Sequence, residues 1–338
     1  MSELLVLSAA DVHALLSFAD CADAMRDVLV ALARGEAQQP LRIVIRPDGA
    51  AGLVALMPSY QAAAAGPPGA AYGLKAIGIT PANPAAGLDT HQGIVLLSAG
   101  DTGEPLAILN ASAVTEIRTA AVSVIATDAL ARQDADVLAV IGTGVQARAH
   151  ILALDGARDL TEIRIAGTGS GKAARLAASL ASQTRVPLTA ADDVRTALRG
   201  AGIVVTATSS AEPVLRRDWL APGTHVNAVG ACLPHARELD TATMAAAAVY
   251  ADRRDGLLSE AGDYLLAAAD GAITPDQVRG ELGEVLADLA PGRADDQEIT
   301  VFESLGLAVE DLAAAAAAYR TAMDRRRAGA SAGTWLPF

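Results

Sequence analysis

The segment 137–147 constrains the fold more than any other part of the sequence. It reads Val-Leu-Ala-Val-Ile-Gly-Thr-Gly-Val-Gln-Ala, an apolar run that leads directly into the pattern Gly-x-Gly-x-x-Ala. This order is typical of the first βα turn of a dinucleotide-binding fold. Gly142 allows the tight turn, Gly144 lets the backbone approach a pyrophosphate, and Ala147 keeps the following helix close to the sheet. The pattern also occurs as an ordinary loop, but the strand before it favours the dinucleotide hypothesis.

The chain alternates between predicted strands and helices from residue 136 onward. Such alternation is typical of a parallel sheet whose strands are joined by helical crossovers. After a further strand at 226–229 the pattern becomes mainly helical, and the Ala-rich segment 307–323 is interpreted as a packing helix. The alternating elements are strands at 137–141, 162–166 and 202–206 and helices at 145–154 and 172–184.

The amino-terminal third has a different pattern, and the chain of 338 residues is long enough for two domains. Residues 8–34 show helical spacing of apolar side chains and predict two short helices. Hydrophobic residues make up 52% and charged residues 19%, a balance typical of a compact globular protein. Strands joined by turns rich in Pro and Gly are predicted at 42–46, 53–57, 73–78 and 93–97.

Charge and cysteine content exclude several classes of partner. The formal net charge of −13 repels nucleic acids and anionic membranes, so neither is expected to bind. Cys21 and Cys232 lie far apart without metal-type spacing, which argues against a disulfide framework or a zinc site. The amino terminus has no secretion signal, and no apolar stretch approaches the roughly 20 residues that span a bilayer. We therefore expect a cytoplasmic protein that binds no metal.

The segment 166–172 bears on the choice of cofactor. A fold that prefers NAD normally places Asp or Glu about twenty residues after the glycine loop, where it binds the ribose hydroxyls. Here the chain reads Ala-Gly-Thr-Gly-Ser-Gly-Lys, and the acid is missing. The hydroxyls of Thr168 and Ser170 and the ammonium of Lys172 suit a 2′-phosphate, so NADP(H) is favoured while NAD(H) stays possible. The alternative is a solvent loop whose glycines serve only the turn.

Motifs spread over nearly the whole chain resemble the ornithine cyclodeaminase and mu-crystallin family, which also contains archaeal-type alanine dehydrogenases and ketimine reductases. The resemblance implies an α/β protein with a Rossmann dinucleotide-binding domain, residues 121–302, inserted into a smaller α+β substrate and dimerisation domain formed by 1–120 with 303–338. It also implies a homodimer. The motifs are Leu41-Arg42, Lys75, residues 101–105, 115–121, the glycine loop with Gln146, and residues 227–230, 260–263, 281–284 and 301–311.

The same resemblance places Arg42, Lys75 and Arg118 where the family holds the substrate. An α-imino acid needs a fixed carboxylate, which a guanidinium binds through two parallel hydrogen bonds. Lys75 lies in an apolar strand, where burial and nearby cations lower the pKa of a lysine and make it a usable proton donor. We therefore predict Lys75 and Arg118 as catalytic residues, although each would otherwise be interpreted as an ordinary surface cation.

The resemblance also implies further contacts with substrate and cofactor. Glu260 is predicted to line the substrate site, where a carboxylate can stabilise a protonated imine, but a solvated acid at a helix end is an equal alternative. Leu305 is predicted to contact substrate. His91 and His235 are interpreted as polar lining and not as catalytic bases. The cofactor contacts implied are Thr90, Arg118, Val145, Gln146, Thr208, Asn227, Val229 and Ser304, in addition to Gly142, Gly144, Thr168, Ser170 and Lys172.

One position departs from the cyclodeaminase pattern. Cyclodeaminases and alanine dehydrogenases carry an aspartate two residues beyond the glycine of Asn-Ala-x-Gly, where this chain has Cys232 at the predicted substrate site. A thiol with an ordinary pKa near 8.5 is a poor base, so deamination with cyclisation is disfavoured. The mu-crystallin branch also lacks this acid.

The sequence as a whole predicts NAD(P)H-dependent reduction of a small cyclic imino acid, such as 1-pyrroline-2-carboxylate or 1-piperideine-2-carboxylate. The alternatives are an open-chain amino-acid dehydrogenase, a lyase of the cyclodeaminase type, and a non-catalytic binding protein of the crystallin kind.

Overall fold

The computed structural model describes residues 3–62, 68–169 and 171–338, and the chain divides into two compact units. The first unit comprises Met1–Arg118 with Leu307–Phe338, and the second comprises Thr119–Gly306. The second unit is thus inserted in the sequence of the first. The sequence predicts divisions after residues 120 and 302, and the structure divides the chain after Arg118 and Gly306.

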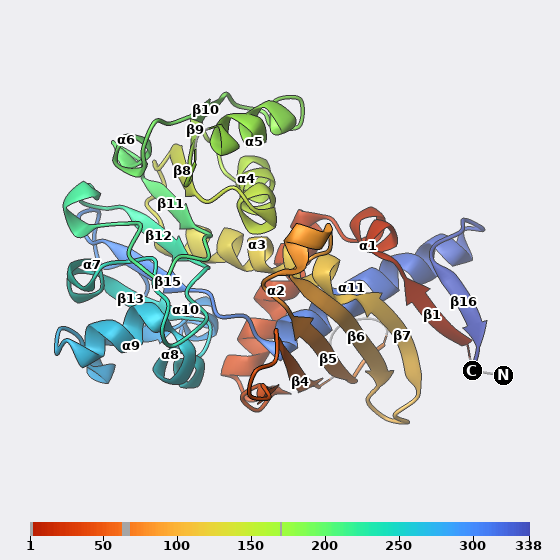
Figure 1. The fold of residues 1–338 in the computed structure, drawn as a ribbon. Helices are drawn as coiled ribbons and strands as arrows, with labels where there is room; N and C mark the ends of the chain where they lie inside the picture. The colour runs from red at the N-terminus through yellow and green to blue at the C-terminus, as the bar shows by residue number, and fades with distance from the viewer. Residues whose placement is uncertain (1–2, 63–67, 170) are drawn as a thin grey trace. The chain divides into compact units, whose positions relative to one another are not determined.

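The first unit is built on a mainly antiparallel sheet (Figure 1). Its long strands form a meander in which each pairs with the next, and β1 runs parallel to β7. The strand order is β16 (Thr334–Pro337), β1 (Glu3–Leu7), β7 (Pro105–Asn110), β6 (His91–Ala99), β5 (Ala71–Ile79), β4 (Leu53–Gln61) and β2 (Ala37–Gln38), with β3 (Ile43–Ile45) paired to β4.

Helix α11 (Ala308–Arg327) packs on one face of this sheet, against β4 to β7 and against α2 (Phe18–Ala33). Small side chains allow the close approach, since a Cβ atom added to Gly73 would lie 2.9 Å from Cβ of Leu312. The interior-facing side chains alternate along the strands as expected for a half-buried sheet. The other helical elements of this unit are α1 (Ala9–Leu15), η1 (Asn83–Ala86) and the first residues of α3 (Ala111–Leu130).

The opposite face of the sheet is apolar and incompletely covered in the described part of the chain. Tyr72 is 50% exposed, Ile94 44% and Val54 44%. Tyr60 and Tyr72 pair across β4 and β5 with ring centroids 5.0 Å apart. We call this surface the outer face of the first unit.

The second unit contains a parallel sheet with helices between its strands. Its central strands β8 and β11 are mostly apolar and almost entirely buried, as expected for a parallel sheet covered on both faces. The strand order is β10 (Leu188–Ala190), β9 (Glu162–Ala166), β8 (Val137–Ile141), β11 (Ile203–Thr206), β12 (His225–Ala228), β15 (Thr300–Glu303), β13 (Ala248–Ala251) and β14 (Val278–Glu281).

The order of these strands reverses between β8 and β11, the point at which doubly wound sheets bind nucleotides. The α/β class predicted from the sequence is therefore confirmed. The helical elements are the remainder of α3, α4 (Val145–Ala157), α5 (Lys172–Leu180), α6 (Val194–Leu198), η2 (Arg217–Trp219), α7 (Thr241–Ala246), α8 (Arg254–Glu260), α9 (Gly262–Ala269), η3 (Pro275–Gln277) and α10 (Leu282–Leu286). None of the described helices is long and apolar enough to cross a bilayer.

The structure corrects the predicted helix 172–184, which ends at Leu180. Polar side chains after this residue bond to nearby carbonyls and compete with the helical ladder. Gln183 Nε2 donates to the carbonyl of Ser179, and Thr184 Oγ1 donates to that of Val186. The strands β1, β2, β7, β10 and β13 to β16 were not predicted from the sequence.

Candidate active site

Lys75 is the buried cation of the first unit. Alternate residues of β5 face α11, and Lys75 occupies one of these interior positions with 3% of its surface exposed. A lysine there would be costly without an anionic partner. Asp311 in the first turn of α11 supplies one, with both carboxylate oxygens 3.1 Å from Lys75 Nζ.

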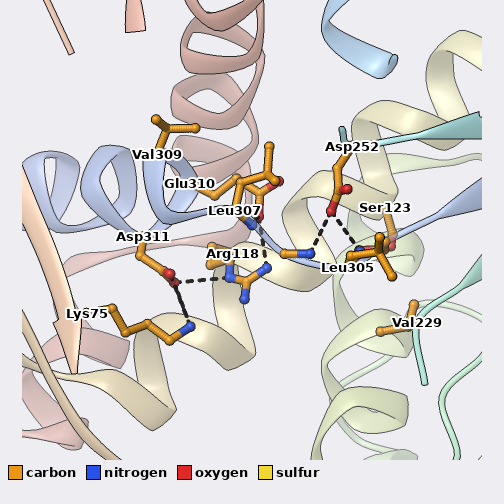
Figure 2. A network of polar contacts seen from close by, with 12 residues as sticks. Lys75, Arg118, Ser123, Val229, Asp252, Leu305, Leu307, Val309, Glu310 and Asp311 are labelled. Atoms are coloured by element: carbon orange, nitrogen blue, oxygen red, sulfur yellow. Dashed lines mark hydrogen bonds and ion pairs between the residues drawn. The ribbon is translucent and has the colours of Figure 1, made fainter. Parts of the chain in front are cut away.

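Arg118 joins the same network, as Figure 2 shows. Its Nε donates to Asp311 Oδ1 at 3.2 Å, and one terminal nitrogen donates to Glu310 Oε2 at 2.9 Å. Glu310 Oε2 also accepts the backbone N–H of Leu307 at 3.0 Å and so caps α11. Two adjacent acids at one helix start therefore hold two buried cations that come from β5 and α3, and carboxylates are favoured there by the helix dipole.

Electrostatics prepare Lys75 for proton transfer. Burial lowers its pKa to about 8; Asp311 opposes this shift, whereas the positive charges of Arg118 and Arg42 add to it. A donor with a pKa close to neutrality is efficient in general acid catalysis. The pKa of His91 is also lowered, first by partial burial and then by the charges of Lys75 and Arg118. The network can thus bind an anion and deliver a proton.

Arg42 lies in the loop before β3, and its positive charge contributes to the lowered pKa of Lys75. Thr90 lies just before β6 and is partly exposed. Glu310 and Asp311 were not among the residues assigned to the site from the sequence, although they close the motif 301–311. Two acids at the start of a buried Ala-rich helix are the signal that could have indicated them, since such a helix buries carboxylates only with cationic partners.

The second unit carries the glycine turn at the carboxyl end of β8. Gly142 has φ +135, and a Cβ added there would lie 2.3 Å from the carbonyl oxygen of Ala207. Gly144 is the N-cap of α4, and a Cβ added to it would meet no described atom within 4 Å. Among the described residues no side chain caps this helix, and Val145 beside it is 55% exposed. An open, uncapped helix start fits the pyrophosphate of a dinucleotide.

The loop after β9 carries the predicted ribose contacts. Thr168 is exposed, and Lys172 is the exposed first residue of α5. Ser170 lies outside the described residues. The guanidinium of Arg175, which was not predicted as a cofactor contact, is also close, because a Cβ added to Gly171 would lie 3.1 Å from one of its terminal nitrogens.

The remaining predicted cofactor residues follow neighbouring strands of the same sheet. Thr208 is partly buried after β11, and Val229 and Ser304 are buried after β12 and β15. Gln146 lies in the first turn of α4 and is partly buried. Asn227 is fully buried, and its side chain donates to Thr127 Oγ1 at 3.0 Å. Asn227 therefore anchors β12 to α3 through its side chain.

The predicted substrate residues of this unit also lie after its strands or at helix ends. Cys232 is partly buried, and its thiol lies 3.4 Å from the carbonyl oxygen of Val229 and 3.7 Å from that of Ser304. The backbone N–H groups of Leu305 and Gly306 both donate to one oxygen of Asp252 (Figure 2). Glu260 is the partly buried last residue of α8, and His235 is exposed.

The fold and the glycine turn define the class of two-domain dinucleotide-binding proteins. The chain belongs to the ornithine cyclodeaminase/mu-crystallin family, which matches residues 2–326. It is 36% identical over 285 residues to the ketimine reductase mu-crystallin of Mus musculus, covering 84% of this chain and 85% of that protein. It is 37% identical over 256 residues to a delta(1)-pyrroline-2-carboxylate reductase of Bacillus cereus, covering 75% of this chain and 78% of that protein.

Solved structures show the same relationship over the full length. The Thermococcus litoralis delta(1)-pyrroline-2-carboxylate reductase in complex with NADH and L-proline has a TM-score of 0.90 and 31% identity, covering 98% of this chain and 99% of that one. An archaeal alanine dehydrogenase dimer with bound NAD has a TM-score of 0.91 and 30% identity, covering 100% of both chains.

Proposed function

We propose that this protein is an oxidoreductase that uses NAD(P)H to reduce a small cyclic imino acid to the corresponding amino acid. The single observation that carries the proposal is the buried network of Lys75, Arg118 and Asp311, which combines a carboxylate-binding guanidinium with a proton donor of lowered pKa. The glycine turn supports a dinucleotide in the same chain. The ketimine reductase at 36% identity and the delta(1)-pyrroline-2-carboxylate reductase at 37% identity support a cyclic imino acid as the substrate class.

The chemistry assigns a role to each cation. Reduction adds a hydride from the reduced cofactor to the imine carbon and a proton to the nitrogen, giving the amino acid and the oxidised cofactor. Arg118 and Arg42 bind the substrate carboxylate and orient the adjacent carbon. Lys75 gives its proton to the imine nitrogen, and a pKa of about 8 keeps it mostly protonated at neutral pH. Asp311 and Glu310 keep both side chains in position.

The cofactor is bound by the second unit. The amides at the start of α4 contact the pyrophosphate, where Gly144 leaves room for it. We further propose a preference for NADP(H), because Lys172 and Arg175 place two cations beside the loop after β9 and no acid follows that strand. The solved relatives named above hold NADH and NAD, so this preference would distinguish the present chain from them.

We further propose that the protein is a cytoplasmic homodimer, and the outer face of the first unit supports the dimer. We expect a second copy of the chain to cover this face, since an exposed apolar surface marks an interaction site and one solved relative is a dimer. Ile94→Glu should shift the protein from dimer to monomer in light scattering, whereas Leu289→Glu, which changes an exposed leucine of the second unit, should not. A monomeric wild type would contradict the proposal.

A screen of imino and amino acids with both nicotinamides tests the function. We expect NADPH oxidation with 1-pyrroline-2-carboxylate or 1-piperideine-2-carboxylate and little activity with pyruvate and ammonia. The reverse preference would favour the open-chain dehydrogenase, for which the structural likeness to alanine dehydrogenase is the supporting observation. Release of ammonia from ornithine would favour a lyase, against which Cys232 argues. Absence of all three activities would leave a binding protein.

A further inference from the structure

Glu238 is a fully buried carboxylate for which the reaction above has no use. It lies between β12 and α7 with 0% of its surface exposed. Its Oε1 accepts the backbone N–H of Thr208 at 2.6 Å, and its Oε2 accepts that of Gly230 at 2.7 Å. Thr208 follows β11 and Gly230 follows β12, so one side chain joins the loops at the carboxyl ends of two adjacent strands.

The two loops are packed in direct contact. A Cβ added to Gly230 would lie 2.1 Å from the carbonyl oxygen of Thr208 and 2.6 Å from Cδ of Glu238. No side chain other than hydrogen fits there without movement of the backbone. The carboxylate therefore fixes an arrangement that also depends on this glycine.

Asp263 holds the backbone at Glu238 in place. Its Oδ1 accepts the backbone N–H groups of Glu238 and Leu239, both at 2.8 Å. Asp263 is 1% exposed and lies in the first turn of α9. A Cβ on the neighbouring Gly262 would lie 1.7 Å from the carbonyl oxygen of Ala236, so the chain before Glu238 is pressed against the start of this helix.

A carboxylate is the side chain that this arrangement requires. Both bonds come from N–H donors, which favour the ionised carboxylate and oppose the rise that burial causes in the pKa of Glu238. In a Gln at this position the amide NH₂ would face one of the two N–H groups and leave a buried donor unpaired. A buried charge is also costly, so Glu238 is a poor choice if it only fills space.

We propose that Glu238 is a positioning residue that holds the loops after β11 and β12 in their cofactor-binding arrangement before the cofactor arrives. The inference rests on the proposed dinucleotide function. In a doubly wound sheet the dinucleotide lies across the point of strand reversal, with its adenosine half on the side of β8 to β10. The two loops tied by Glu238 lie on the other side and serve the nicotinamide half.

Glu238→Gln tests this role through two ligands. We expect the dissociation constant of NADPH to rise roughly tenfold or more, while that of adenosine 2′,5′-bisphosphate, a probe of the adenosine half, stays within about twofold of wild type. Asp155→Asn is the matched control. Asp155 is a buried carboxylate of the same unit that accepts the N–H of Arg185 at 2.8 Å, and it lies near the carboxyl end of α4, the end of that helix away from the glycine turn. The Asp155→Asn variant should bind NADPH and adenosine 2′,5′-bisphosphate with the affinities of wild type.

Equal losses for both ligands, or no loss for NADPH in folded Glu238→Gln protein, would overturn the proposal. Failure of the dinucleotide function would look different, because the wild type itself would then bind neither ligand. Hydrogen exchange of the cofactor-free wild type gives a second test that needs no variant. The amides of Thr208 and Gly230 should exchange slowly before any cofactor is added. Exchange at the rate of an open loop, slowed only by NADPH, would contradict the inference.

Discussion

Replacement of Asp311 by Asn tests the proton donor of the proposed reaction. The carboxylate of Asp311 lies 3.1 Å from Nζ of Lys75 and 3.2 Å from Nε of Arg118, and all three residues are at most 4% exposed. At 3.1 Å the attraction between the charges of Lys75 and Asp311 is on the order of 5 kcal/mol for an effective dielectric constant of about 20. An Asn keeps one acceptor oxygen but removes the charge, and hence most of this attraction.

The direction of the effect follows from the pKa of Lys75. Burial lowers it to about 8, and Asp311 opposes that shift, so its loss lets the pKa fall further. Reduction needs the protonated amine, so kcat/KM of the wild type should fall above about pH 8. In Asp311→Asn the fall should begin at lower pH. Each pH unit of displacement corresponds to about 1.4 kcal/mol and to a tenfold loss of kcat/KM on the alkaline side.

Glu310→Gln is the matched control, because it removes the same charge from the adjacent residue. Glu310 contacts Arg118 at 2.9 Å and the N–H of Leu307 at 3.0 Å. This variant should raise KM for the imino acid and leave the alkaline limb near that of wild type. The assay is kcat/KM against pH, with thermal unfolding recorded for each variant, because loss of one partner of a buried ion pair costs about 3–5 kcal/mol. Superimposable limbs for wild type and Asp311→Asn, or equal displacement in Glu310→Gln, would refute the reasoning.

Three further variants test the glycine turn, the choice of cofactor and the role of the thiol. Gly144→Val should fold normally, because its Cβ meets open space, and should lose NADPH binding in a fluorescence titration; unchanged affinity would remove the glycine turn from the site. Lys172→Ala should reduce the ratio of kcat/KM for NADPH over NADH by about tenfold, the size of one charge-assisted contact, and an unaltered ratio would exclude Lys172 from phosphate binding. Cys232→Ala should keep most of the reductase activity, and its loss in folded protein would give the thiol a catalytic role.

Four of the eight strands of the inserted parallel sheet, β8, β9, β11 and β12, could be predicted from the sequence, because they alternate with helical segments after residue 136. The predicted bounds of β8 and β9 agree with the structure, since each run ends at a glycine or a polar turn. The end of α5 was predicted less well. There Gln183 and Thr184 bond to carbonyls within a few residues, and local competition of this kind is not visible in apolar spacing. The strands β1 and β7 pair over about a hundred residues of sequence, which no local pattern reveals.

In the candidate site, too, local motifs could be predicted from the sequence, whereas contacts between distant residues could not. Lys75 and Arg118 could be indicated by motif resemblance, but their partners could not be derived from spacing. Asp311 lies 236 residues after Lys75 and 193 after Arg118, and only the packing of α11 on β5 brings these side chains together. The roles of Glu238 and Asp263 could not be predicted from the sequence for a related reason. Both bond to backbone N–H groups, which carry no side-chain signature in a sequence.

The central claim is that this chain transfers a hydride from a nicotinamide to the imine carbon of a cyclic imino acid. Incubation of the protein with 1-pyrroline-2-carboxylate and NADPH that carries deuterium on the transferable face of its C4 tests it directly. We expect proline with one deuterium on its α-carbon, formed in proportion to the cofactor oxidised and absent with the Gly144→Val variant. Proline without deuterium, or oxidation of the cofactor with no amino acid formed, would contradict the account.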